Sequence, residues 1–376
     1  MIRTSAPLKL VIAGEWAVLE PNSCAIVAAI NNRLFCEIES NPKNEIEISL
    51  LDFNIKEVSA IYKDNELVFT QPLDKKTENY IRLTKFVIES ALFLFNYFKP
   101  FKIRTWCEKP TCFSSCSETK FGLGSSAAAI VAILAALHVF YNIPLNKKRE
   151  MERLFKFCLL SHYILQNMRG SGIDIAAAFY GGIIHYTRFD PVWVSQKIQN
   201  NFPLDIFIEY KWPNLEINHL PPIPDMKLLL GWTQKPASTS HLISQMETFK
   251  IRNAPIYHEL ISQITKLVKD LTKAWRKKNK SRILADIKIN EMYLRRLSEI
   301  SGIPIEIPEL RLLCEIADEL GGAGKLSGAG GGDCGIAICF DEEISTKILE
   351  EWEKYNIIGT KMEIDFDGLK IETSKF

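Results

Sequence analysis

A glycine-rich run with two serines, Lys120-Phe-Gly-Leu-Gly-Ser-Ser-Ala-Ala-Ala129, stands directly before an apolar segment typical of a buried helix. Glycine lets the backbone approach an anion closely, and the free N–H groups and the dipole at a helix start attract negative charge. A tight turn without a ligand is the simpler alternative. The run matches neither a Walker A loop nor a dinucleotide fingerprint. The residues that we expect to contact phosphate are Lys120, Gly122, Leu123, Gly124, Ser125, Ser126 and Ala127.

Three other segments carry residues suited to phosphate chemistry. They are Pro7-Leu-Lys9 near the start of the chain, Gly170-Ser-Gly-Ile-Asp174 in the middle, and Ser327-Gly-Ala-Gly-Gly-Gly-Asp333 near the end. In this order, and together with the Gly-Leu-Gly-Ser-Ser run, they resemble the signature segments of the GHMP kinase family over nearly the whole chain. The resemblance implies an α+β, two-domain GHMP kinase fold with the active site in the interdomain cleft. It also implies ATP and Mg²⁺ as cofactors and a small molecule as substrate.

The resemblance also assigns individual roles. Lys9 is expected to act on the reacting oxygens, Asp174 to be the second catalytic residue, and Ser126 to be a ligand of Mg²⁺, a hard cation that prefers oxygen. Simpler interpretations stay open for these residues. Asp174 follows Gly172 at the start of a predicted helix, where a carboxylate is often only a cap, and Ser125 and Ser126 suit the same capping role.

Two segments bear on the acceptor, Gly170–Gly182 and Gly231–Ser240, which resemble the branch of the family whose acceptor is itself a phosphate ester. Such an ester has a second pKa of about 6, so its attacking oxygen is largely anionic near pH 7 and needs no general base. Asp174 would then only position the substrate. Two polyanions also need several converging cations or N–H groups. The expected substrate-binding residues are Ser171, Gly172, Arg188, Lys235, Ser238, Thr239, Ser240, Gly328, Ala329 and Gly330.

These assignments have plainer alternatives. Isolated basic residues are common on any surface, and the cluster Ser238–Ser240 precedes an apolar helix as an N-cap cluster would. Tyr163 stands where some relatives have a glutamate that helps to hold magnesium, so the second metal ligand is unidentified. His162 and His241 have no visible metal-binding partner, and we interpret them as packing or hydrogen-bonding residues. A non-catalytic ligand sensor on the same fold is the alternative from another functional class.

Composition excludes broad classes of partner. The chain has 376 residues, 47% of them hydrophobic, and a net charge of +1, which argues against binding to nucleic acid or to a membrane surface. The most apolar stretch, 127–139, is shorter than the ~20 residues that cross a bilayer. The first residues do not resemble a signal peptide, so we expect a cytoplasmic protein. The oligomeric state stays open.

The elements that must hold these motifs follow from hydrophobic periodicity. Strands are expected at the N-terminus, at 101–107, 183–186, 206–210, 227–232, 335–340 and 362–371. Helices are expected at 79–98, 125–141, 147–166, 175–180, 239–249, 257–275, 308–320 and 342–355. The prolines in Pro221–Pro224 indicate a linker, because proline removes backbone donors and stiffens the chain. The sequence therefore predicts an N-terminal domain over 1–220 and a C-terminal domain over 225–376.

Overall fold

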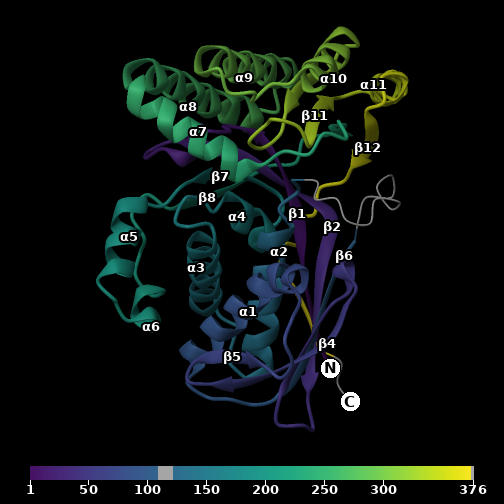
Figure 1. Cartoon of the computed structure of the whole chain (residues 1–376). Helices are drawn as coiled ribbons and strands as arrows, with labels where there is room; N and C mark the ends of the chain where they lie inside the picture. Colours follow the sequence, from purple (N-terminus) through teal and green to yellow (C-terminus); the bar gives the residue numbers. More distant parts are fainter. Residues whose placement is uncertain (109–121, 374–376) are drawn as a thin grey trace.

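The structure, a computed structural model, describes residues 1–108 and 122–373 (Figure 1). The first group of elements runs through β1 (Ile2–Ala13), β2 (Cys24–Ser40), β3 (Ile46–Leu50), β4 (Ile55–Lys63), β5 (Glu66–Phe69), α1 (Lys75–Phe95), β6 (Phe101–Cys107), α2 (Ser125–Phe140), α3 (Lys148–Leu165), α4 (Ile173–Tyr180), β7 (Ile183–Thr187), α5 (Pro191–Gln199), α6 (Leu204–Phe207) and β8 (Glu216–Leu220). The second runs through β9 (Lys227–Trp232), α7 (Thr239–Arg252), α8 (Ala254–Arg276), α9 (Lys280–Ser301), α10 (Pro308–Glu319), β10 (Ala323–Leu326), β11 (Cys334–Cys339), α11 (Glu342–Lys354), β12 (Ile358–Met362) and β13 (Lys370–Thr373). Two domains of mixed α and β structure result, as the family resemblance implies.

The larger sheet is organised around one long strand. Its strands follow the order β13-β1-β2-β6-β3-β4-β5, and β7 pairs with β2 and β8. The first part of β2, from Cys24 to Ala28, pairs with β7, whereas the part from Leu34 to Ser40 pairs with β6. All described pairs are antiparallel except β3 with β6, which is parallel. This arrangement puts β1, which carries Lys9, in the interior of the sheet.

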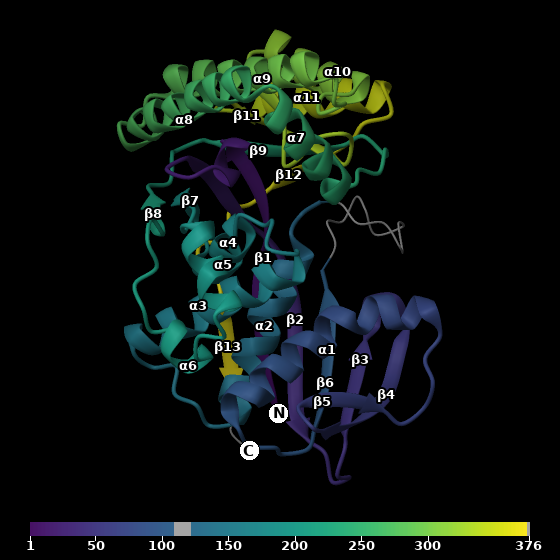
Figure 2. The ribbon, with the colours of Figure 1, turned by 60° about the vertical axis from the view of Figure 1, so that its left-hand side comes forward.

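Helix α2 is buried almost all round, because Ala, Val, Ile and Leu occupy nearly every position of its sequence. A helix with no polar face belongs in the core, and α2 packs on β1 and β2 with α1, α3 and α4 beside it (Figure 2). Its first residue, Ser125, follows directly on the glycine run. Because α2 is packed in the core, its first residues are fixed beside β1.

The smaller sheet has the order β10-β11-β9-β12 and is antiparallel throughout. Helices α9 and α10 contact β10, α11 contacts β9 and β12, and α8 packs along α9. Figures 1 and 2 show these helices as a layer at the top of the molecule, above the small sheet. The loop between β10 and β11, which contains Ser327–Asp333, faces back toward the first domain.

The end of the chain differs from the sequence-based expectation. A single strand was expected over 362–371, but β12 ends at Met362 and β13 starts at Lys370, where it pairs with β1 in the larger sheet. Ile364, which lies between β12 and β13, forms an isolated antiparallel bridge with Ile30 of β2. The expected second domain, 225–376, thus contains a strand that belongs to the first sheet. The division near Pro221–Pro224 itself stays a prediction.

A second difference concerns Ile206–Tyr210, which was expected to be a strand. Residues Leu204–Phe207 form the short helix α6, because Pro203 starts the turn and Asp205 lies in its first turn, where a carboxylate is favourable. The ring of Phe207 stacks on that of Trp212 at 5.1 Å. Aromatic packing, and not strand pairing, therefore explains the apolar residues there.

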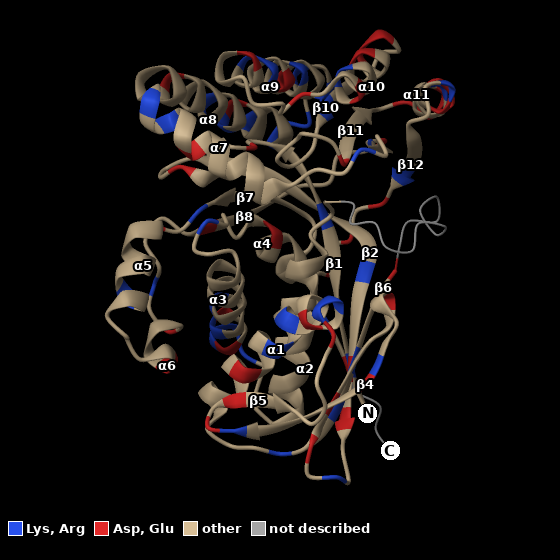
Figure 3. Cartoon of the chain, in the orientation of Figure 1, with Lys and Arg blue, Asp and Glu red and all other residues tan. Residues whose placement is uncertain are grey.

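Charged residues are distributed over both domains. Lysines and arginines alternate with aspartates and glutamates over most elements of both domains (Figure 3), in line with the net charge of +1. Within the described residues, none of the helices combines the length and the apolar character that a membrane span requires.

Candidate active site

Lys9 connects the first strand to the glycine run. Its backbone N–H donates to the carbonyl of Leu123 at 2.9 Å, and its Nζ donates to the carbonyl of Gly122 at 3.1 Å. The same Nζ lies 3.5 Å from Oδ1 of Asp174. The residue is only 7% exposed. The lysine is thus held in a fixed position between the glycine run and the aspartate.

Gly124 makes this position available to the lysine. Its φ is +82°, which L side chains rarely adopt, and an added Cβ would lie 3.0 Å from Cγ of Lys9. Gly122 faces Asp333 in the same way, because an added Cβ there would lie 3.0 Å from Oδ2 of Asp333. The two glycines are therefore surfaces against which a lysine from one domain and an aspartate from the other lie.

The start of α2 offers N–H groups to an anion. The N–H groups of Ala127 and Ala128 both donate to the carbonyl of Gly124, whereas those of Ser125 and Ser126 have no acceptor within the described part of the chain. Leu123 is buried, and both serines are exposed. Gly124 is the N-cap, so neither serine is merely a cap. Lys120, the remaining residue of the expected loop, lies outside the described residues.

Asp174 stands in the first turn of α4. Gly172 is the N-cap of that helix and has no side chain, so Asp174 does not serve as the cap. Its side chain is 25% exposed and faces Lys9. The turn before it is fixed by Ser171, whose Oγ accepts from the N–H of Ile173 and whose carbonyl accepts from the hydroxyl of Tyr186 at 2.8 Å. The carboxylate is therefore free to meet a ligand.

His162, on α3, lies behind these groups. Its Nε2 is 3.5 Å from Oγ of Ser126 and 3.0 Å from the amide nitrogen of Gln166. Burial lowers the pKa of the His162 imidazole, while the charge of Asp174 raises it and that of Lys9 lowers it. We expected only a packing or hydrogen-bonding role from the sequence. The structure brings this histidine next to the expected metal ligand.

Asp333 ends the second glycine loop and lies close to Gly122 of the first domain. Its Oδ1 accepts from the N–H of Ala237 at 3.2 Å, and its N–H donates to the carbonyl of Lys235 at 2.6 Å. Burial raises the pKa of the Asp333 carboxyl, whereas the N–H of Ala237 and the charge of Lys9 lower it. We did not single out Asp333 from the sequence. Its position at the end of a glycine run was the available signal.

The second glycine loop is also tied to β1 and to the chain before α10. Oγ of Ser327 donates to the carbonyl of Val11 at 3.1 Å and accepts from its N–H at 3.0 Å. The N–H of Gly331 donates to the carbonyl of Ile305 at 2.7 Å, and a Cβ on Gly330 would collide with that same carbonyl. Glycine at 330 is therefore required by a close approach of two backbones.

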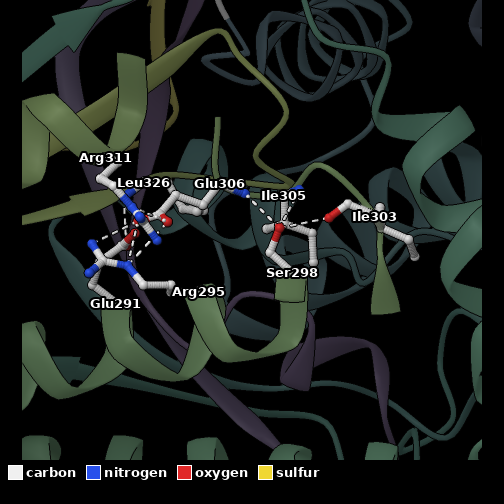
Figure 4. Close-up of polar contacts among 8 residues, drawn as sticks. All are labelled: Glu291, Arg295, Ser298, Ile303, Ile305, Glu306, Arg311 and Leu326. Atoms are coloured by element: carbon white, nitrogen blue, oxygen red, sulfur yellow. Dashed lines mark hydrogen bonds and ion pairs between the residues drawn. The ribbon is translucent and has the colours of Figure 1, made fainter. Parts of the chain in front are cut away.

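Helix α9 holds the segment Ile303–Glu306, which contacts this loop (Figure 4). Oγ of Ser298 accepts from the N–H groups of Ile305 and Glu306 and donates to the carbonyl of Ile303 at 2.7 Å. The carboxylate of Glu306 is held by Arg295 at 2.9 Å and by Arg311 at 3.0 Å. Two arginines and a serine thus fix the segment Ile303–Glu306, against which Gly330 and Gly331 lie.

A buried ion pair lies on the other side of the same loop. Lys325, fully buried on β10, pairs with the carboxylate of Glu15, just after β1. On α9, Asn290 accepts from the N–H of Gly14 at 3.2 Å, and Glu291 accepts from the N–H of Leu326 at 2.9 Å. Burial raises the pKa of Glu291 to about 7, against the opposing effect of Lys325. These contacts lock the two domains together beside the site.

The two cations predicted to bind substrate, Arg188 and Lys235, have different surroundings. Arg188 is 6% exposed, donates to the carbonyl of Leu19, and stacks over the ring of Phe189 at 5.6 Å. Burial lowers the pKa of its guanidinium. Lys235 is exposed at 59% of its side chain and lies 3.6 Å from Glu309. Arg188 is thus a packed cation that anchors the turn after β1, whereas only the backbone of Lys235 contacts Asp333.

The remaining expected substrate residues lie at the rim of the loops. Ser238 is the N-cap residue of α7 without a side-chain cap bond, and its Oγ lies 3.4 Å from that of Ser240. Thr239 is exposed beside them. Gly328 has no neighbour within 4 Å of an added Cβ, and Ala329 is half-buried. The start of α7 is joined to the site through Ala237 and Asp333.

A comparison with known families accounts for this geometry. The model of the GHMP kinases N-terminal domain matches residues 82–182, and the model of the GHMP kinases C-terminal domain matches residues 276–358. The chain belongs to the GHMP kinase family. As a GHMP kinase it is ATP-dependent, so the start of α2 and the glycine run before it are suited to the phosphates of ATP.

Several GHMP kinases match along their whole length. The phosphomevalonate kinase of Streptomyces sp. (strain CL190) is 29% identical over 372 residues, which cover 97% of each chain. The mevalonate kinase of Thermococcus gammatolerans is 25% identical over 394 residues, which cover 99% of this chain and 98% of that one. The solved structure of Streptococcus pneumoniae phosphomevalonate kinase in complex with phosphomevalonate and AMPPNP superposes with a TM-score of 0.78 at 25% identity, covering 96% of this chain and 100% of that chain.

Proposed function

We propose that this GHMP kinase transfers the γ-phosphoryl group of ATP to mevalonate 5-phosphate, giving mevalonate 5-diphosphate and ADP in the mevalonate pathway of isoprenoid synthesis. The observation that carries the proposal is the contact of Lys9 with both Gly122 and Asp174, at 3.1 and 3.5 Å. Through these contacts the ammonium group of Lys9 lies between the glycine run proposed to bind ATP and the carboxylate of Asp174. The 29% identity with the Streptomyces phosphomevalonate kinase supports this acceptor.

The donor phosphates would bind at the start of α2. The N–H groups of Ser125 and Ser126 and the backbone of Gly122–Gly124 can donate to or approach phosphate oxygens, and the helix dipole favours negative charge there. Because these donors are fixed by a core helix, they need no reorganisation when charge develops on the transferring group.

A divalent cation fits the oxygens near this point. Oγ of Ser126 and the carboxylate of Asp174 are hard oxygen donors, the type that Mg²⁺ prefers, and Mg²⁺ usually takes only one or two protein ligands besides phosphate oxygens and water. When bound, the cation would neutralise negative charge on the donor phosphates. Ser126 is the residue that we expect to hold it.

The acceptor oxygen would attack phosphorus, the bond between that phosphorus and the bridging oxygen of ADP would break, and ADP would leave with the electron pair. A phosphate monoester is largely doubly ionised near pH 7, so no residue needs to remove a proton. Lys9 would then stabilise charge on the reacting oxygens, and Asp174 would orient Lys9 or bind a hydroxyl of the acceptor. Ser171, Gly172, Gly328–Gly330 and the start of α7 at Ser238–Ser240 are the proposed acceptor contacts, with Lys235 at their edge.

A second acceptor, mevalonate itself, is favoured by the 25% identity with the Thermococcus mevalonate kinase. Against it stands Tyr163, at the position where relatives that phosphorylate mevalonate have a glutamate. The Tyr163 ring is buried against Phe189 at 5.2 Å, and its hydroxyl lies 3.2 Å from Oγ of Ser195, so it does not replace that carboxylate.

The test is release of ADP by the purified protein with mevalonate, mevalonate 5-phosphate and mevalonate 5-diphosphate measured in parallel. We expect turnover with the monophosphate to exceed that with either alternative. Turnover with mevalonate but not with its monophosphate would replace the proposal with a mevalonate kinase. Binding of ATP without turnover of any acceptor would favour a ligand sensor.

A further inference from the structure

His162 stands out among the buried polar groups, because nothing in the proposed reaction uses it. It is 3% exposed, it lies on α3, and its Nδ1 has no hydrogen-bond partner within the described residues. A buried polar side chain with an unsatisfied atom costs free energy, so it persists where another contact requires it. The other ring nitrogen, Nε2, supplies that contact.

Two donors converge on Nε2. The amide nitrogen of Gln166 lies at 3.0 Å, and an amide nitrogen is always a donor, so Nε2 must be an acceptor. The hydroxyl of Ser126 lies at 3.5 Å, the outer limit of a hydrogen bond. Such contacts in a ligand-free site are often long and tighten when the substrates bind.

Gln166 fixes the ring from the other side. Its carbonyl oxygen faces Gly170, where any Cβ would collide with it, so only a glycine leaves room for this amide. In this arrangement the amide nitrogen of Gln166 lies toward His162, and its oxygen lies toward Gly170. The chain of contacts runs from Ser126 on α2 through His162 on α3 and Gln166, the C-cap of α3, to the turn that precedes Asp174 on α4.

From this arrangement we propose that His162 is a positioning residue that turns the hydroxyl hydrogen of Ser126 toward its own Nε2, so that the lone pairs of Oγ face a nucleotide-bound cation. A hydroxyl has one hydrogen and two lone pairs, and a fixed acceptor for the hydrogen directs the lone pairs elsewhere. Partners behind a metal ligand typically change metal affinity by about 10–100-fold when they are removed. The inference rests on the proposed role of Ser126, and not on which acceptor is phosphorylated.

The experiment measures binding of Mn²⁺ by electron paramagnetic resonance in the presence of the non-hydrolysable ATP analogue AMPPNP, without any acceptor. His162→Leu should weaken Mn²⁺ binding by about tenfold. His162→Gln, whose amide oxygen can replace Nε2 as an acceptor, should stay within about threefold of the wild type. Binding of AMPPNP in EDTA should be the same in all three proteins. If His162 only stabilised the fold, its loss would not weaken Mn²⁺ binding while leaving the binding of AMPPNP in EDTA unchanged.

His138→Leu is the matched control. His138 is also buried, on α2, but its Nδ1 bonds to the carbonyl of Leu134 at 2.7 Å and its ring packs on Phe95, away from the site. Its loss should lower the melting temperature and leave Mn²⁺ affinity unchanged. Equal loss of Mn²⁺ affinity in His138→Leu and His162→Leu would overturn the proposal.

A double-mutant cycle tests whether the histidine acts through the serine. In a Ser126→Ala background, His162→Leu should cause no further loss of Mn²⁺ affinity, because the hydroxyl that it orients is gone. Additive losses, or a folded His162→Leu protein with wild-type Mn²⁺ affinity, would refute the role. If His162→Leu fails to fold, Gln166→Met removes the amide that fixes the ring from an exposed position, and the same loss of affinity is expected from it.

Discussion

Nζ of Lys9 lies 3.5 Å from Oδ1 of Asp174 and 3.1 Å from the carbonyl of Gly122. The two side chains come from β1 and α4, so an ion pair at the centre of the site is built from elements far apart in the sequence. A carboxylate this close to a lysine has two uses in a kinase. It can take a proton from an alcohol, or it can hold the lysine and the substrate in place.

Substitution of Lys9 and of Asp174 distinguishes proton transfer from positioning as the role of the carboxylate. Lys9→Met removes charge from the reacting oxygens and should lower kcat by about 10²–10³-fold. Asp174→Asn should lower kcat with mevalonate 5-phosphate by less than about 100-fold, because a phosphate oxygen needs no base. Steady-state ADP release measures both. Lys288→Met, which breaks a comparable pair with Asp318 at 3.6 Å outside the site, should leave kcat unchanged. An Asp174→Asn loss as severe as that of Lys9→Met would contradict a purely positioning role for Asp174.

Gly124→Ala tests whether the loop backbone sets the position of the lysine. Alanine at φ +82° costs roughly 1–2 kcal/mol, and its Cβ would lie 3.0 Å from Cγ of Lys9. We expect lower stability by urea unfolding together with a large fall in kcat. Gly302→Ala introduces similar strain at φ +68°, with no atom within 4 Å of the new Cβ. It should lower stability and leave kcat unaltered, and an equal fall in kcat would show that strain alone, without displacement of Lys9, is responsible.

The sequence predicted the parts of the site that have a local signature. Glycines at positive φ, and a serine pair before an apolar helix, mark the phosphate loop without reference to the rest of the fold. The pair of Lys9 with Asp174 needed the family resemblance, since no periodicity relates β1 to α4. Asp333 and His162 were missed as site residues, because their roles depend on contacts with Gly122 and Ser126 that only the tertiary structure creates.

The support of the site was less predictable. Sequence reasoning missed α9, because polar residues occupy buried positions between its apolar ones: Asn290 is fully buried among Ile283, Ile287, Leu294 and Leu297. Its amide bonds to Gly14, which is remote in sequence. The start of strand β13 was also predicted wrongly, because its partner β1 lies at the opposite end of the chain and leaves no local signal.

Ser298→Ala tests the support of the second glycine loop. The substitution removes the hydroxyl that accepts from the N–H groups of Ile305 and Glu306, at 3.1 and 3.3 Å, and leaves Ile305 only the carbonyl of Ile303. It should cost about 1–3 kcal/mol of stability. The carbonyl of Ile305 holds Gly331, so the loop should loosen and KM for the acceptor should rise more than KM for ATP. Ser345→Ala removes a similar bond, to the carbonyl of Glu342, on α11 and should change neither KM. Unaltered KM values in folded Ser298→Ala would dissociate the loop from this support.

Glu291 makes the stability of the protein depend on pH. Burial raises the pKa of its carboxyl from 4.5 to about 7 in the folded protein, so between these values the folded state binds more protons than the unfolded state. Stability from this group is complete below pH 4.5 and is lost as pH rises through 7. Glu291→Gln keeps an acceptor for the N–H of Leu326 and removes the titration, so its free energy of unfolding relative to the wild type should increase from pH 5 to pH 8, by an amount on the order of 1–3 kcal/mol.

Urea unfolding at pH 5, 6.5 and 8 measures this difference for Glu291→Gln. Glu299→Gln provides the control on the same helix, because Glu299 is 53% exposed and pairs with Arg296 at 3.6 Å. Its difference from the wild type should stay flat across the window. The charge of Lys325 lowers the pKa of Glu291 and so opposes the rise. Lys325→Met, with Glu291 in place, should therefore move the pH dependence of stability to higher pH. A Glu291→Gln difference that stays flat from pH 5 to pH 8 would mean that the charge of Lys325 outweighs burial, and that Glu291 is charged throughout this range.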